Sequence, residues 1–295
     1  TGKGGVGKST LVAALAIEAA RRGRRPLIVE LGHRASMQAI FEAPTIGHHP
    51  VEVAPGVHAT NIELDRALAE YVDAHVPVRA VARRIRESPF LARFFEAAPA
   101  VAEVLTLFRI ERLLAEADDG GAPRWSPVLV DLDATGHALM FLELGNVFAG
   151  LATGGPVRTL LDSFAALLSD RERTRLHVVT LPGRLPITET IELVVRLERE
   201  HAVPLGTIFV NRVRPAPIAP EAEPILAELL ARASHAALRE DLTLLAAATA
   251  RHAAVQRELA RLDALPLARV TLPELRPPID PRSLGVLGRI AGGEP

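Results

Sequence analysis

The first nine residues constrain this chain more than any other segment. They read TGKGGVGKS, so residues 2–9 satisfy the pattern G-x-x-x-x-G-K-[ST] in full. The glycines allow backbone N–H groups to approach phosphate oxygens without a side-chain clash, and the positive end of a helix dipole adds to their attraction. Apolar residues at helical spacing follow over residues 8–22, and Gly23 ends the run. The pattern predicts a polyphosphate-binding loop at the start of a helix.

Two side chains complete the predicted phosphate cage. We expect the Lys8 ammonium to lie between the terminal phosphates and the Ser9 hydroxyl to bind Mg²⁺. The chain is therefore predicted to bind a nucleoside triphosphate together with magnesium.

Short apolar runs spaced along the chain predict buried strands. They occupy residues 26–30, 127–131, 176–181, 207–210 and 267–272, with helical patterns between most of them. Strands that alternate with helices indicate an α/β fold with a doubly wound, mostly parallel sheet and ligands at the carboxyl ends of the strands. We expect residues 1–295 to form a single domain. Because a phosphate loop normally follows a buried strand, we also expect a first strand ahead of Thr1.

Two stretches depart from this alternation. Four helix-like segments in succession predict a helical insertion over about residues 64–118. A second helical stretch, in which nearly all residues are apolar, is expected over about residues 137–169. The first of these stretches is expected to rise from the sheet.

Composition excludes several classes of function. The chain has no cysteine, which rules out disulfides, thiolate zinc sites and cysteine-ligated iron–sulfur clusters. A formal net charge of −1 gives no overall field toward nucleic acid or anionic lipid, so no nucleic-acid partner is predicted. No charge-free run of 18 apolar residues occurs, so we expect no stable membrane insertion and a cytoplasmic location. Adjacent residues rarely bind the same metal ion, so His48 and His49 are interpreted as solvated.

The loop also resembles that of a known class of proteins. Residues 3–10, KGGVGKST, resemble the variant phosphate loop of dimerising ATPases, which include the MinD and ParA proteins, the nitrogenase iron protein and the ArsA-type ATPases. The resemblance implies that ATP is the nucleotide. It also implies that Lys3 reaches across a homodimer interface to the phosphates held by the partner subunit.

A second segment narrows the resemblance to one family. Residues 130–139, VDLDATGHAL, resemble the D-T-A-P-T-G-H-x-L signature of the ArsA family, whose members drive arsenite pumps or deliver tail-anchored membrane proteins. Asp131 ends an apolar strand and is implied to hold a magnesium-bound water, although residues 132–134 depart from the signature. Residues 180–190 and 210–212 are also similar to the family, and Asn211 is implied to read the adenine edge. Because arsenite activation, the zinc clamp of the targeting factors and the nitrogenase cluster all need cysteine, none is expected here.

One departure from the family affects catalysis. Family members usually hold an Asp in a stretch such as S-T-D-P-A after the second strand, and this chain has Gly32 at that position. Glu30, His33 and Asp133 are candidate substitutes, and the sequence does not choose among them. Positioning the nucleophile is a large part of phosphoryl transfer, so slow or partner-dependent hydrolysis is expected.

These arguments define a predicted site. The predicted catalytic residues are Lys3, Lys8 and Asp131, and the predicted magnesium-binding residues are Ser9 and Asp131. The predicted nucleotide-binding residues are Gly2, Lys3, Gly4, Gly5, Val6, Gly7, Lys8, Ser9, Thr10 and Asn211.

Three functions fit this site. The first, which we favour, is a dimeric ATP-driven switch whose helical insertions bind an apolar client such as a membrane-protein segment. The apolar side chains that suggest it are Phe90, Phe94, Phe95, Phe108, Met140, Phe141 and Phe148. The second is a positioning ATPase like ParA or MinD, which would need a basic surface or an amphipathic membrane helix. The third is a regulatory subunit that binds ATP with little turnover.

Overall fold

The strands of this protein form two sheets. The computed structural model describes residues 1–31, 35–76, 78–86, 99–132, 155–201, 203–276 and 279–293. Within these ranges the sheets have the strand orders β2-β3-β1-β4 and β5-β6-β7. The strands are β1 (Leu27–Glu30), β2 (Val51–Ala54), β3 (Val57–Asn61), β4 (Val128–Asp131), β5 (Leu176–Thr180), β6 (Leu205–Val213) and β7 (Arg269–Pro273).

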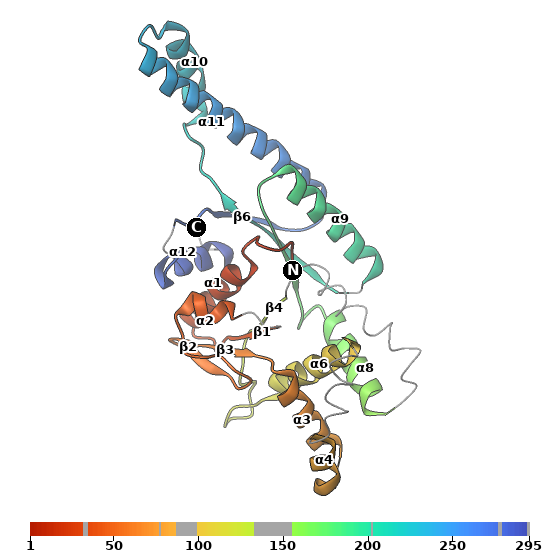
Figure 1. The fold of residues 1–295 in the computed structure, drawn as a ribbon. Helices are drawn as coiled ribbons and strands as arrows, with labels where there is room; N and C mark the ends of the chain where they lie inside the picture. The colour runs from red at the N-terminus through yellow and green to blue at the C-terminus, as the bar shows by residue number, and fades with distance from the viewer. Residues whose placement is uncertain are drawn as a thin grey trace.

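Helices connect most of these strands (Figure 1). They are α1 (Lys8–Arg21), α2 (Ser36–Phe41), α3 (Leu64–His75), α4 (Arg79–Arg86), α6 (Pro99–Ala115), α8 (Pro156–Ser169), α9 (Arg184–Glu200), α10 (Glu223–Arg232), α11 (Ala236–Ala260) and α12 (Pro281–Ala291). The predicted helix over residues 8–22 is confirmed as α1.

The pairing of the strands is mostly parallel, as predicted. In the first sheet β1 pairs in parallel with β3 and β4, and in the second β6 pairs in parallel with β5 and β7. All five predicted strands are present. The sequence analysis missed an antiparallel hairpin, β2 and β3, which turns at Pro55-Gly56, where Gly56 has a φ of 74°.

Helices cover the strands on both faces, which confirms the doubly wound fold. Side chains of β1 alternate between two cores, so that Ile28 packs with α1 and α12 whereas Leu27 and Val29 pack with α6 and α8. The core beneath α1 and α12 continues across both sheets, because it also contains residues of β5, β6 and β7. The other face of the second sheet packs against α9 and α11. The helix that follows the phosphate loop is therefore anchored to both sheets.

Close packing against α12 fixes the position of α1. A Cβ placed on Gly288 of α12 would lie 2.3 Å from the Ala14 carbonyl oxygen of α1, so the two helices approach as closely as a glycine allows. Nearby on α1, the buried carboxylate of Glu18 accepts hydrogen bonds from Arg21 and Arg22. These contacts make α1 a rigid support for the loop at its start.

The described part of the predicted insertion is helical. Helices α3, α4 and α6 lie within residues 64–118, and Figure 1 shows α3 and α4 projecting away from the sheets. Helix α8 forms the described end of the second predicted stretch and packs on α6, while residues 137–154 lie outside the described part of the chain. Phe108 is buried in the core between α6 and the first sheet. The other six side chains of the proposed client surface lie outside the described residues.

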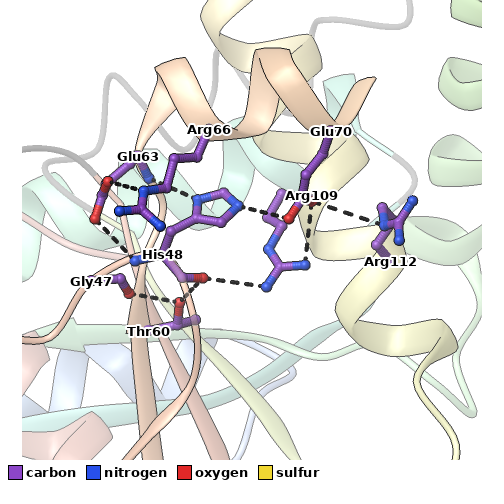
Figure 2. Close-up of polar contacts among 8 residues, drawn as sticks. All are labelled: Gly47, His48, Thr60, Glu63, Arg66, Glu70, Arg109 and Arg112. Carbon is purple, nitrogen blue, oxygen red and sulfur yellow. Dashed lines mark hydrogen bonds and ion pairs between the residues drawn. The ribbon is translucent and has the colours of Figure 1, made fainter. Parts of the chain in front are cut away.

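The interpretation of His48 as a solvated residue was wrong. Its side chain is buried, and Figure 2 shows it at the centre of a polar cluster that joins the loop before β2 to α3 and α6. The ring accepts a hydrogen bond from the Glu63 backbone N–H at Nδ1, 3.3 Å away, and Nε2 lies 3.2 Å from Glu70 Oε1. Burial and the nearby Arg109 guanidinium lower the pKa of His48. No pattern in the sequence near His48 indicates that the helical insertion covers it. His49 beside it is exposed, as expected.

A second helical projection follows β6. Helices α10 and α11 pack on each other and extend away from the sheets as a hairpin (Figure 1). Several large apolar side chains of this hairpin are exposed, namely Ile225, Leu229, Leu238 and Leu244. Over the described residues, no helix has both the length and the apolar character needed to cross a membrane.

Candidate phosphate-binding site

The loop of residues 2–7 runs from Thr1, which is hydrogen-bonded to β5, to the start of α1. Thr1 donates a hydrogen bond to the His177 carbonyl at 2.7 Å and accepts one from the Val179 backbone N–H at 2.8 Å, so it lies alongside β5. At the other end Gly7 is the N-cap of α1, with a left-handed φ of 94°. The loop is thus fixed at both ends, and the backbone N–H groups of the first helical turn face its interior.

Two of its glycines cannot be replaced without a clash. Gly2 has a φ of +145°, and a Cβ there would lie 2.2 Å from the Val179 carbonyl oxygen. At Gly7 a Cβ would lie 2.2 Å from Asn211 Nδ2. The close approach of β5 and β6 therefore explains why the loop needs glycine at these positions, beyond any contact with a ligand.

A pocket of about 220 Å³ opens beside the loop. Its lining includes Gly5, Gly7, Lys8, Ser9 and Thr10 from the loop and the first turn of α1. The rest comes from the carboxyl ends of strands and the segments after them, namely Glu30, Leu31, Ser36, Asp131, Leu132 and Arg212. Ligand binding at the carboxyl ends of parallel strands was predicted, and the pocket lies there.

Lys8 curls back over the loop. Its Nζ donates to the carbonyl oxygens of Gly2 at 3.0 Å and Lys3 at 3.1 Å. The ammonium is therefore held at the rim of the pocket by the backbone of its own loop. An anion in the pocket would find a positive charge already in place.

Ser9 and Asp131, the two predicted magnesium-binding residues, lie in contact. The Ser9 hydroxyl donates to Asp131 Oδ2 over 2.6 Å, although the two residues are 122 positions apart in the chain. A hydroxyl and a carboxylate beside a phosphate loop are the hard oxygen ligands that Mg²⁺ prefers. The residues present therefore fit a magnesium ion at this point of the pocket.

Lys3 points away from its own pocket. Its Nζ lies 2.6 Å from Glu189 Oε1 on α9, and 57% of the lysine side chain is exposed. Glu189 belongs to the Thr-Glu-Thr sequence that follows β5, and α9 begins five residues before Glu189, at Arg184. The ammonium of Lys3 is thus available at the surface rather than engaged with the loop that carries it.

Asn211 contacts the back of the phosphate loop. Its Nδ2 donates to the Val6 carbonyl at 2.9 Å, and its Oδ1 accepts from the Arg212 backbone N–H at 2.9 Å. Val6 is itself buried in the core beneath α1. Asn211 therefore supports the loop, and its reading of adenine stays a prediction.

The sequence analysis missed Arg212 as a pocket residue. It lines the pocket and has a φ of 59°, a left-handed conformation that is uncommon for a residue with a side chain. Glu30 was weighed only as a substitute for the missing Asp, and it lines the pocket from the end of β1. The strand-end rule that singled out Asp131 applies equally to Glu30, whereas no sequence signal indicated Arg212. Gly32, His33, Asp133 and the Thr135-Gly136-His137 triplet lie outside the described residues.

The fold and this site together define a class. A glycine-rich loop at the N-terminus of a helix, a hydroxyl–carboxylate pair beside it and parallel strands covered on both faces are the features of a P-loop nucleotide-binding protein.

Comparison with known proteins identifies the family. The family profile described as anion-transporting ATPase, of the ArsA ATPases, matches residues 1–153. The protein named ATPase BagA of Mycobacterium tuberculosis is 31% identical to this chain, over 96% of the chain and 88% of the relative. Arsenical pump-driving ATPases of Acidiphilium multivorum and Escherichia coli are each 28% identical over 68% of this chain, which spans 36% and 34% of their lengths. The chain belongs to the ArsA ATPase family, as the loop and signature residues had indicated.

Proposed function

We propose that this protein binds ATP with magnesium, hydrolyses it, and works as a homodimeric nucleotide-driven switch. The observation that carries the proposal is the contact of Ser9 with Asp131 beside Lys8, in a pocket at the head of α1. Residues that are distant in the chain provide a cation, a hydroxyl and a carboxylate at one point, which is the set that a magnesium–triphosphate complex needs.

Each of these residues would have a separate task. The backbone N–H groups of the loop and of the first turn of α1 would bind phosphate oxygens. Lys8 would exchange its hydrogen bonds to loop carbonyls for bonds to the terminal phosphates. Magnesium, when bound, offsets the negative charge of the triphosphate, and Ser9 and Asp131 would hold it in position.

Dimerisation is proposed from the placement of Lys3. A lysine within a phosphate loop that points away from its own pocket has no evident task in the monomer beyond its ion pair with Glu189, whose side chain is 36% exposed. The Lys3 side chain is 57% exposed, so solvent screens the pair and limits its contribution to stability. In a dimer that faces two pockets together, Lys3 would reach the phosphates of the partner subunit.

The helical insertion is the part of the chain that we propose contacts an apolar or membrane-protein client. Helices α3 and α4 project from the body, and the His48 cluster joins α3 and α6 to the edge of the first sheet. Phe108 does not belong to a client surface, because it is buried beneath α6. The name of the arsenical pump-driving relatives says that those proteins drive an arsenical pump, and the absence of cysteine from this chain argues for a different cargo.

Calorimetry tests the proposal most directly. We expect heat of binding when the protein is titrated with ATP and magnesium, and its loss in the Lys8→Ala variant. Lys8→Arg serves as a control, since it keeps the charge but lacks a compact ammonium, and it should bind more weakly than wild type. Absence of binding by folded wild-type protein would refute the proposed function.

Measurement of phosphate release then distinguishes a switch that hydrolyses ATP from a regulatory subunit that binds ATP with little turnover. We expect slow steady-state turnover in wild type, because position 32 lacks the usual Asp. Lys8→Ala should abolish this turnover. Turnover that is identical in wild type and Lys8→Ala would show that the measured activity comes from a contaminant, and would leave the regulatory-subunit function in its place.

A further inference from the structure

A buried carboxylate stands beside the proposed magnesium position. Glu30 ends β1, and in the parallel pairing of β1 with β4 it lies opposite Asp131. The residue is 3% exposed, yet it lines the pocket together with Ser9 and Asp131. Two acidic side chains thus lie next to each other at the carboxyl ends of neighbouring strands.

The two oxygens of this carboxylate have different environments. Oε1 accepts a hydrogen bond from the Met37 backbone N–H at 3.0 Å, in the first turn of α2. Oε2 is buried and has no hydrogen-bond partner among the described residues. Oε1 therefore caps α2, because the N-cap residue Ala35 has no side-chain acceptor. Oε2 is left without a hydrogen-bond donor from the described part of the chain.

A role in capping α2 alone does not account for this arrangement. A buried carboxylate oxygen without a donor or cation is costly, and a shorter or neutral cap such as Ser or Asn would avoid the cost. Glu30 lines the same pocket as the Ser9–Asp131 pair. The bound waters of a cation at that pair would supply the donor that Oε2 lacks within the described residues.

We propose that Glu30 is a positioning residue for the nucleotide-bound magnesium, with Oε2 accepting from the metal's hydration shell while Oε1 holds α2. This inference rests on the proposed binding of ATP with magnesium. It places an acidic group two residues before position 32, where this chain has glycine in place of the family's usual Asp. It also connects the pocket to α2, because one carboxylate contacts both.

The first test measures the magnesium requirement of nucleotide binding. In Glu30→Gln, we expect the magnesium concentration for half-maximal tightening of ATP binding to rise about tenfold, as for other outer-shell groups of metal sites. Binding of ATP in the presence of a chelator should remain within about twofold of wild type, because the loop itself is intact. An unchanged magnesium requirement would overturn the inference and leave Glu30 as a helix cap.

Glu18→Gln is the matched control. It also neutralises a buried carboxylate, but on the α12 side of α1. We expect it to lower the melting temperature and to leave the magnesium requirement at the wild-type value. If both variants shift the requirement equally, the effect is one of general destabilisation and the inference fails.

A second readout follows α2 without using activity. In wild type, the Met37 amide should exchange more slowly with solvent when ATP and magnesium are added together than when ATP is added with chelator. In Glu30→Gln this additional protection should be lost; if it persists, α2 responds to the nucleotide by another route and the inference is overturned.

The outcomes separate this inference from the proposed function. Failure of wild type to bind ATP with magnesium refutes the function itself, whereas normal binding with an unaltered Glu30→Gln requirement refutes only the role of Glu30. Should Glu30→Gln not fold, Glu30→Asp replaces it, since it keeps the charge but shortens the reach. A magnesium requirement that stays at the wild-type value in that variant would likewise overturn the inference.

Discussion

Lys3 and Lys8 are the only lysines in the sequence, and every other basic residue among the 34 is arginine. An ammonium is a compact charge with freely rotating donors, whereas a guanidinium is broad and planar. A narrow phosphate loop can surround an ammonium but not a guanidinium. Both lysines lie in or directly after the glycine-rich loop, and the Lys8 ammonium is the one that contacts the loop carbonyls.

This composition allows a direct test of Lys3. Protein labelled with ¹⁵N only at lysine should give two lysine backbone signals, one from each residue. We expect the Lys8 signal to shift when ATP and magnesium are added, and the Lys3 signal to shift when the dimer forms, because the Lys3 ammonium leaves Glu189. Glu189→Gln is the control, since it removes the ion pair at the start; a Lys3 signal that stays at the wild-type, nucleotide-free position throughout would contradict its contact with the partner subunit.

At the residue scale, the features that could be predicted from the sequence are those that depend on neighbouring residues in the chain. The loop residues and Asp131 follow from a contiguous motif and from a strand end, and the structure brings Ser9 and Asp131 within 2.6 Å. Burial of Glu30 and His48 depends on segments that fold over them from elsewhere in the chain, so no pattern near them could indicate it. The left-handed backbone of Arg212 likewise results from the irregular pairing at the end of β6.

At the scale of elements, the contact of α1 with α12 determines how firmly the phosphate loop is held. Gly288→Ala should destabilise the protein by about 2 kcal/mol, because the new methyl group would overlap the Ala14 carbonyl. Gly285→Ala, on the same helix, is the control: its Cβ would meet nothing within 4 Å among the described residues, and alanine favours helix by up to about 1 kcal/mol. Chemical denaturation of both variants measures the difference, and equal stabilities would contradict the close contact.

The ion pairs of Glu18 make this contact sensitive to acid. Hydrogen bonds from Arg21, and then from Arg22, lower the pKa of Glu18 to about 2 from its ordinary value of 4.5. The stabilisation is therefore complete above pH 4.5 and is lost as pH falls toward 2. Glu18→Gln should cost about 2 kcal/mol at pH 7 and much less near pH 2, as measured by the free energy of unfolding. A deficit that is independent of pH would show that Glu18 acts by packing rather than by charge.

The missed hairpin of β2 and β3 shows where element prediction failed. Its strands have four and five residues and are separated by Pro55-Gly56, so the alternation is too short to stand out from a loop. The five predicted strands lie between helical patterns along most of the chain, and each was found. Parallel pairing follows from the helices between strands, whereas the antiparallel edge depends on a turn that the periodicity analysis did not weigh.

At the scale of the whole molecule, the proposed switch requires two copies of the chain to associate. We expect the mass in solution to be that of a monomer without nucleotide and of a dimer with magnesium and a non-hydrolysable ATP analogue, measured by light scattering. Lys3→Ala should bind the analogue but dimerise less, since its own pocket is unchanged. Complete dimerisation of Lys3→Ala would remove Lys3 from the interface.

The α10–α11 hairpin would enlarge small movements that begin near the pocket. It leaves the body from β6, which carries Asn211 and Arg212, and the base of α11 packs on α9, which carries Glu189. At 25 residues α11 is about 37 Å long, so a tilt of about 10° at its base would carry its tip about 6 Å. A small movement of β6 or α9 would therefore become a displacement of several ångströms at the tip of the hairpin, where exposed leucines lie.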